Sequence, residues 1–208
     1  MTEVKRFTVG LLETNCYLVY DTEEKIGFLI DPGTFDKKIA KVIEENNIRI
    51  RNIINTHGHA DHTSGNKRFG YPILIHEKDS DFLKNAAKNL AHFMSPTFVS
   101  PPAERLLKDG DVIKEGKLML HVIHTPGHTP GGICLETGNR IFTGDTLFRE
   151  SVGRTDFPYG SEKDLLNSVK KRLMVFPDEI EVLPGHGEGS TIGHERRNNP
   201  FLRGVRDD

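Results

Sequence analysis

Seven histidine and aspartate side chains, in four short segments, have the types and spacing of metal ligands. Four share the segment T-H-G-H-A-D-H, and the others follow in T-P-G-H-T-P-G, F-T-G-D-T-L-F and L-P-G-H-G. The seven are His57, His59, Asp61, His62, His128, Asp145 and His186. Imidazoles and carboxylates without a thiolate suit zinc, iron or manganese and are typical of catalytic rather than structural sites. Seven ligands exceed the needs of one tetrahedral ion, so the sequence predicts two divalent ions that share a carboxylate and leave positions open for water and substrate.

The spacing inside the first segment predicts how its ligands divide between two ions. His57 and His59 stand two residues apart, so an extended segment points both side chains to the same side. Asp61 and His62 follow where the chain must turn, so they cannot reach the same point equally well. We therefore expect the first pair to bind one ion and the second pair to bind an adjacent ion.

The elements that must position these ligands are strands. Apolar and β-branched runs predict strands at residues 16–20, 27–30, 50–54, 71–75, 118–122, 133–135, 141–143 and 180–183. Turns at 21–25 and 137–139 predict two hairpins. Each ligand segment follows a predicted strand. Because loops at one end of a sheet bring distant residues together on a rigid scaffold, the seven side chains are expected to converge.

Helices are predicted at residues 35–46, 79–93 and 161–176, and residues 63–64 are expected to open a short helix. Three prolines predict a loop at 95–104. This order of elements fits two sheets packed face to face with helices outside, and a mixed α/β sheet also fits. Composition does not separate the two architectures.

Composition limits the remaining function classes. The length of 208 residues predicts one domain over 1–208, and Cys16 and Cys134 are expected to be buried thiols rather than a disulfide. A net charge of −2 without a long basic run gives no reason to expect nucleic acid as a partner. No signal peptide or apolar run of about 18 residues stands out, so we expect a cytoplasmic protein without a membrane partner. The oligomeric state stays open.

The pattern H-x-H-x-D-H at 57–62, followed by His128, Asp145 and His186, resembles the metallo-β-lactamase superfamily over nearly the whole chain. The resemblance implies an α+β fold, a four-layer αββα sandwich with metals at one edge between the two sheets. It also implies that Asp31, in L-I-D-P-G, supports the metal site from behind the ligands.

The later motifs resemble glyoxalase II, the hydroxyacylglutathione hydrolases, and the segment at 190–202 resembles the shorter bacterial enzymes of that kind. This implies a dinuclear metal-dependent hydrolase of thioesters such as S-lactoylglutathione, with zinc as the first expectation and iron or manganese as alternatives. The C-terminal helical domain that helps longer relatives hold glutathione is not expected, so the use of glutathione is open. Common dinuclear β-lactamases place a cysteine where Asp145 stands, so β-lactamase activity is not expected.

The resemblance further implies a division of roles. One ion is expected on His57, His59 and His128, the other on Asp61, His62 and His186, with Asp145 bridging both. A hydroxide between the ions would attack the thioester carbonyl, and Asp61 would orient the water or accept its proton.

The segment G-R-T-D-F at 153–157 also resembles the persulfide dioxygenases, which would hold one iron on His57, His59, His128 and Asp145. A non-enzymatic electron-transfer or binding module is a less favoured alternative. Arg154 is a candidate to hold a substrate carboxylate or, alternatively, to pair with Asp156, and Tyr159 is a weaker candidate for the pocket wall.

Overall fold

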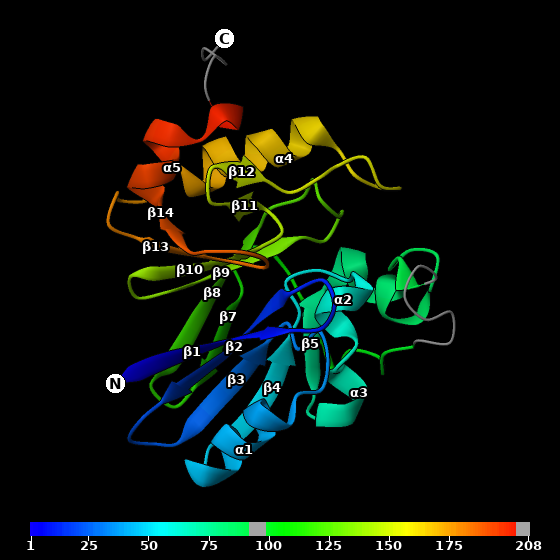
Figure 1. The fold of residues 1–208 in the computed structure, drawn as a ribbon, viewed down its shortest axis with the longest axis vertical. Helices are drawn as coiled ribbons and strands as arrows, with labels where there is room; N and C mark the ends of the chain where they lie inside the picture. Colours follow the sequence, from blue (N-terminus) through cyan, green and yellow to red (C-terminus); the bar gives the residue numbers. More distant parts are fainter. Residues whose placement is uncertain (92–98, 203–208) are drawn as a thin grey trace.

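Two β-sheets lie face to face with helices on their outer sides (Figure 1). The computed structural model of the chain describes residues 1–91 and 99–202. Within these ranges the first sheet has six strands in the order β1-β2-β3-β4-β5-β6. They are β1 Thr2–Val9, β2 Thr14–Asp21, β3 Ile26–Ile30, β4 Arg49–Ile54, β5 Ile73–His76 and β6 Arg105–Leu107. The first three pair antiparallel, and β3 to β6 pair parallel.

The second sheet has the order β14-β13-β10-β9-β8-β7, and only its β10–β13 pair is parallel. Its strands are β7 Val112–Glu115, β8 Leu118–His124, β9 Ile133–Thr137, β10 Arg140–Gly144, β13 Glu181–Pro184 and β14 Ser190–Thr191. A separate small hairpin pairs β11 Leu147–Phe148 with β12 Ser151–Val152.

Helices cover both outer faces (Figure 1). Beside the first sheet lie α1 Lys37–Glu45, α2 Ala60–Thr63, α3 Asn66–Phe69 and the 3-10 helix η1 Glu77–Lys84. Beside the second lie α4 Glu162–Ser168, its π-helical continuation η3 Val169–Leu173, α5 Ile192–Asn198 and the 3-10 helix η4 Pro200–Leu202. In the described ranges no helix is both long and apolar enough to cross a bilayer.

Three apolar cores separate the four layers. Between the sheets, Tyr17 and Phe28 of the first sheet pack with Phe142 of the second. A second core lies between the first sheet and α1, and a third between the second sheet and the helical segment that starts at α4. The αββα sandwich implied by the family resemblance is therefore confirmed, and the single mixed sheet is excluded.

Strand β2 explains how one segment serves two cores. All eight of its residues are buried, and successive side chains point to opposite faces. Tyr17 and Val19 enter the core between the sheets, while Cys16, Leu18 and Tyr20 face α1. Cys134 belongs to the third core, so the two cysteines are buried free thiols on different sheets, as predicted.

Most predicted elements are confirmed, including both hairpins and the helix that forms α1. The helix predicted at 161–176 is present, but its α-helical part ends at Ser168 and a π-helical segment continues it to Leu173. The short helix after the histidine motif begins at Ala60, not at residue 63, and Ser64 is its C-cap. Strand β1, helix α5 and the short strands β6, β7, β11, β12 and β14 were not predicted.

The helix predicted at 79–93 is wrong. The 3-10 helix η1 ends at Lys84, and the Asn85 side-chain oxygen then accepts the amides of Ala87 and Lys88. Such side-chain bonds to nearby backbone compete with helical hydrogen bonds. Leu90 has a left-handed φ of 62°, which is incompatible with a continuing helix. Residues 92–93 of this prediction, and 95–98 of the predicted loop at 95–104, lie outside the described residues.

Candidate metal centre

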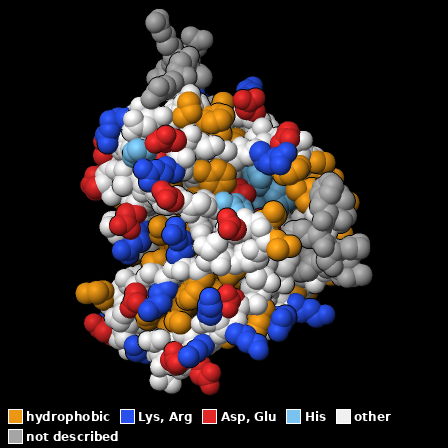
Figure 2. All heavy atoms as spheres, in the orientation of Figure 1, with side chains coloured by type: hydrophobic (Ala, Val, Ile, Leu, Met, Phe, Trp, Pro, Cys, Tyr) orange, Lys and Arg blue, Asp and Glu red, His pale blue; other side chains and the backbone are white. Residues whose placement is uncertain are grey.

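The seven predicted ligands meet at one edge of the sandwich, at the ends of four strands. His57 and His59 follow β4, His128 follows β8, Asp145 follows β10, and His186 follows β13. Neighbouring members of this set lie within a few ångströms of each other across the two sheets. Histidine side chains reach the surface of this face beside hydrophobic ones (Figure 2). The convergence expected from the strand-end positions is thus present.

A first cluster consists of three ring nitrogens. His57 Nε2 lies 3.1 Å from His59 Nδ1, and His59 Nδ1 lies 2.9 Å from His128 Nε2. Nitrogens bound to one tetrahedral zinc at about 2.0–2.1 Å are about 3.4 Å apart. The three rings are buried, so this triangle offers converging lone pairs close to the spacing that one ion requires.

A second cluster combines two imidazoles with a carboxylate. His62 Nε2 lies 3.2 Å from His186 Nε2, and Asp61 Oδ2 lies 3.5 Å from the first nitrogen and 3.2 Å from the second. Asp61 also accepts a hydrogen bond of 3.4 Å from the Thr14 hydroxyl. The ligand atoms of this triangle are close enough together to hold a second ion.

The Asp145 carboxylate lies between the two clusters. Its Oδ2 is 3.5 Å from His128 Nε2 and 3.6 Å from His186 Nε2. Its Oδ1 lies 3.3 Å from His62 Nε2 but outside hydrogen-bond geometry, so this buried oxygen has no hydrogen-bond partner among the described residues. Buried polar atoms are almost always satisfied, and a cation would satisfy this one. The side chains therefore fit a pair of metal ions.

The protonation states agree with that fit. Burial lowers the pKa of His59 to about 3, so its ring is neutral and can donate a lone pair. Burial also acts to lower the pKa of His62, but the carboxylates of Asp61, Asp145 and Asp31 raise it well above its usual value. The negative charge gathered around His62 thus requires a positive charge, which a metal ion can provide.

The outward-facing ring nitrogens are held by the protein. His62 Nδ1 lies 3.0 Å from Asp31 Oδ2, and His128 Nδ1 lies 2.7 Å from the Arg154 carbonyl. His186 Nδ1 lies 2.9 Å from the Leu12 carbonyl. Partners of this kind fix the tautomer and direction of a metal-binding imidazole.

The loop that carries His186 is tied to the N-terminal part of the chain. The Asn15 amide donates to the carbonyls of Pro184 (3.0 Å) and Gly187 (2.9 Å). The Tyr17 hydroxyl donates to the same Pro184 carbonyl at 2.7 Å. Strand β2 therefore holds the last ligand in place from the facing sheet.

A family model for the metallo-beta-lactamase superfamily matches residues 9–186. The chain belongs to this superfamily. It is 35% identical over 202 residues to the hydroxyacylglutathione hydrolase GloC of Haemophilus influenzae, and the match covers 93% of this chain and 95% of that protein. The glyoxalase II-like resemblance of the sequence is thereby supported.

Solved superfamily structures have the same fold. BLEG-1, a B3 metallo-beta-lactamase, superposes with a TM-score of 0.90 at 31% identity, covering 97% of this chain and 100% of that one. TTHA1623 in a di-iron-bound form gives 0.80 at 34% identity, covering 95% and 100%. ETHE1 from Myxococcus xanthus gives 0.79 at 27% identity, covering 95% and 83%.

A cavity of about 670 Å³ opens onto the candidate metal centre. His59 and His128 of the first cluster and Asp61 and His186 of the second lie in its wall, so both clusters face it. The rest of the wall is mainly apolar, from Leu12, Leu90, Phe148, Val152 and Phe157. This mixture of convergent polar groups and apolar walls is typical of a small-molecule site.

The two predicted substrate contacts differ in position. Arg154 lines the cavity, but its guanidinium donates two hydrogen bonds, of 2.7 and 2.6 Å, to the Asp156 carboxylate. It also stacks 3.9 Å from the centroid of Phe157. Tyr159 is outside the lining of the cavity, and its ring packs edge-on against Phe82 at 5.8 Å. The Arg154 guanidinium therefore pairs with Asp156, which was the alternative to binding a substrate carboxylate.

Sequence reasoning missed two buried residues behind the ligands. Thr56 donates its backbone amide and hydroxyl to Asp31 at 2.8 and 2.6 Å, and its hydroxyl oxygen lies 3.2 Å from His57 Nδ1. Because Thr56 directly precedes the histidine motif, its position in the sequence could have identified it as a residue near the ligands. Asp79 accepts three hydrogen bonds beside the histidine loops, but it stands in a segment without a motif.

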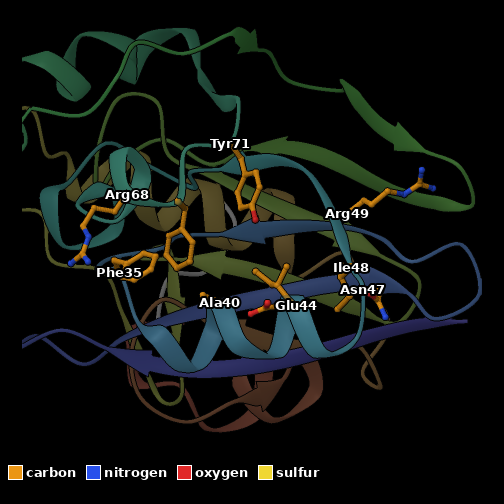
Figure 3. A pocket seen from close by; sticks show the side chains of 10 residues that line it. Phe35, Ala40, Glu44, Asn47, Ile48, Arg49, Arg68 and Tyr71 are labelled. Atoms are coloured by element: carbon orange, nitrogen blue, oxygen red, sulfur yellow. The ribbon is translucent and has the colours of Figure 1, made fainter.

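A second cavity, of about 610 Å³, lies beside α1 and contains none of the candidate ligands (Figure 3). Its wall includes Phe35, Phe69 and Tyr71, and the Arg68 guanidinium lies 4.2 Å from the centroid of Phe35. Candidate metal ligands therefore line the first cavity and not this one.

Proposed function

We propose that this superfamily member is a dinuclear metal-dependent hydrolase of thioesters of the hydroxyacylglutathione type. The observation that carries the proposal is the pair of ligand triangles that meet at Asp145. In this assignment His57, His59 and His128 hold one ion, while Asp61, His62 and His186 hold the other. Two zinc ions are proposed, although the same ligands accept iron or manganese.

Two ions bound there would supply the positive charge that lowers the pKa of a water molecule and polarises a carbonyl group. The chain itself supplies the geometry. Asp61 lines the cavity and is oriented by the Thr14 hydroxyl, so its carboxylate is placed to orient a water molecule or accept its proton. The apolar walls exclude water around the acyl group, and a thiolate leaves with little acid assistance.

The substrate class is supported by similarity to GloC, a hydroxyacylglutathione hydrolase. The likeness to a di-iron-bound structure supports two ions rather than one. The likeness to BLEG-1, a B3 metallo-beta-lactamase, makes a β-lactam the necessary comparison substrate.

The direct test uses the full chain purified from metal-replete culture, with its bound metals counted before assay. We expect close to two ions per chain and hydrolysis of S-lactoylglutathione, followed through the released thiol. Activity should disappear on chelation and return with added zinc. A chain with two ions that cleaves a cephalosporin but neither S-lactoylglutathione nor a neutral thioester would contradict the proposal.

A second candidate is a mononuclear iron persulfide dioxygenase. The segment G-R-T-D-F at 153–157 and the likeness to ETHE1 favour it, with iron on His57, His59, His128 and Asp145. His186→Ala separates the two candidates because it removes a ligand from the second cluster only. The hydrolase should lose turnover in this variant, whereas the dioxygenase should keep one iron and continue to consume oxygen with glutathione persulfide.

A further inference from the structure

A fully buried carboxylate, Asp79, lies directly behind the first cluster. It belongs to the 3-10 helix η1, and none of its side chain is exposed. Its Oδ2 accepts hydrogen bonds from the Gly58 amide at 2.9 Å and the Thr129 hydroxyl at 2.7 Å. Its Oδ1 accepts the Gly131 amide at 2.6 Å. All three partners donate, so the site is built for an ionised acceptor.

These three partners stand next to the candidate ligands in two different loops. Gly58 separates His57 from His59, and Thr129 directly follows His128. The loop after β4 in the first sheet and the loop after β8 in the second are therefore joined through one carboxylate. These two loops carry His59 and His128, whose Nδ1 and Nε2 atoms are 2.9 Å apart.

Glycine is required at both backbone partners because η1 lies so close. A Cβ at Gly131 would lie 2.6 Å from Asp79 Oδ1, and a Cβ at Gly58 would lie 2.3 Å from Cβ of Phe82 in the same helix. The carbonyl of Asn89, shortly after η1, accepts the amide of Ala60 at 2.8 Å. Residues 77–91 thus pack directly against the loop that carries His57 and His59.

We propose that Asp79 is a positioning residue that sets the separation of His59 and His128 and thereby the metal affinity of the first cluster. It touches neither substrate nor metal and acts through the backbone of the two loops. This inference rests on the proposed metal centre, but not on the identity of the substrate.

The test is Asp79→Asn in the full chain. The amide has nearly the same shape, but its NH2 group cannot accept a hydrogen bond, so the bond from either the Gly58 or the Gly131 amide is lost. Loss of a partner behind metal ligands typically weakens metal binding about 10- to 100-fold, and we expect about 10-fold weaker zinc binding in competition with a chromophoric chelator. Hydrogen exchange at the amides of Gly58 and Gly131 should become faster.

Asp21→Asn is the matched control, because Asp21 is also a buried carboxylate that accepts two backbone amides, those of Glu23 and Glu24. It lies at the far end of β2 from Thr14, so its loss should lower stability but leave zinc affinity at the wild-type value. Asp79→Asn with wild-type zinc affinity and unchanged exchange at both glycines would overturn the inference.

Thr129→Val keeps the test decisive if the Asp79 variant does not fold. It removes one of the three hydrogen bonds and retains the backbone contacts. We expect a smaller, measurable loss of zinc affinity, and a folded Thr129→Val protein with wild-type affinity would reject the positioning role. Zinc binding is measured without turnover, so failure of the thioesterase proposal and failure of this inference give different results.

Discussion

Asp31 Oδ2 lies 3.0 Å from Nδ1 of His62, across 31 positions of sequence. The same carboxylate accepts the amide and hydroxyl of Thr56, which precedes His57. Asp31 has a left-handed φ of 49°, a conformation uncommon outside glycine that is held when surrounding contacts determine it. The end of β3 thus orients residues that belong to both ligand clusters.

Replacing Asp31 should therefore weaken metal binding more than it weakens the fold. We expect Asp31→Ala to lower zinc affinity about 10- to 100-fold, since His62 loses the partner that fixes its tautomer. Zinc competition titrations would measure the loss. Asp36→Asn is the control, because Asp36 caps helix α1 a few residues later and asparagine retains the cap. Equal affinities in the two variants would refute the role of Asp31.

Asp145 is expected to be indispensable to both ions. In Asp145→Ala the carboxylate between His62 and His128 is removed, so the metal content should fall below two per chain and thioester turnover should be lost. Elemental analysis and the released-thiol assay report these two effects separately. Full activity in the alanine variant would exclude the dinuclear scheme.

Metal removal should lower the stability of the fold. Without cations, the unpartnered Asp145 Oδ1 and the carboxylates around His62 remain buried in mutual repulsion. A ligand held at 100 times its dissociation constant stabilises the native state by about 2.7 kcal/mol. Thermal unfolding with and without chelator should show a loss of at least this order in the wild type and a smaller one in Asp145→Ala. Coincident transitions in the wild type would contradict the expected coupling.

Removing the Asp156 carboxylate that pairs with Arg154 should change the preference between anionic and neutral thioesters. The Asp156 carboxylate neutralises the guanidinium at the cavity wall, so Asp156→Asn should lower KM for anionic thioesters by a few-fold. Arg154→Ala should raise KM for the same substrates. A neutral thioester serves as the control in both variants. If anionic and neutral substrates respond alike, Arg154 has no role in binding charge.

The two thiols should be unreactive in the native protein. Burial raises the pKa of Cys134 to about 11 and that of Cys16 well above its usual value, so little thiolate forms at moderately alkaline pH. Alkylation by iodoacetamide at pH 8 should be slow until denaturant is added, after which both residues should react. Rapid labelling of Cys16 in the folded chain would show that the second core opens, and rapid labelling of Cys134 would show that the third core opens.

The ligand motifs and most of the strands that carry them were accessible from sequence because they depend on short-range patterns. His57, His59 and Asp61 stand within one segment, and apolar runs before each ligand predict the strands that bring them together. The choice between the two architectures was not accessible, since both place apolar strands next to helices. Only the family resemblance selected the sandwich.

Contacts that depend on tertiary packing could not be predicted. The apolar spacing at 79–93 resembles a helix, yet Asn85 and Leu90 turn the chain so that the Asn89 carbonyl reaches Ala60. In the sequence Asp79 is an ordinary polar residue, and its role becomes visible only when the structure brings the two ligand loops next to it. The Arg154 pairing with Asp156 was anticipated as one of two alternatives, and geometry was needed to distinguish them.

The hydrogen bonds from Asn15 and Tyr17 to Pro184 have a consequence for biosynthesis. They join residues separated by 169 and 167 positions, and His186 reaches the Leu12 carbonyl across 174. Proteins emerge from the ribosome with the N-terminal part first, and such distant contacts form slowly. The nascent chain can assemble the cluster of His57, His59 and His128 while the last ligand is still untranslated. The second cluster can therefore be completed only after the segment that carries His186 has been synthesised.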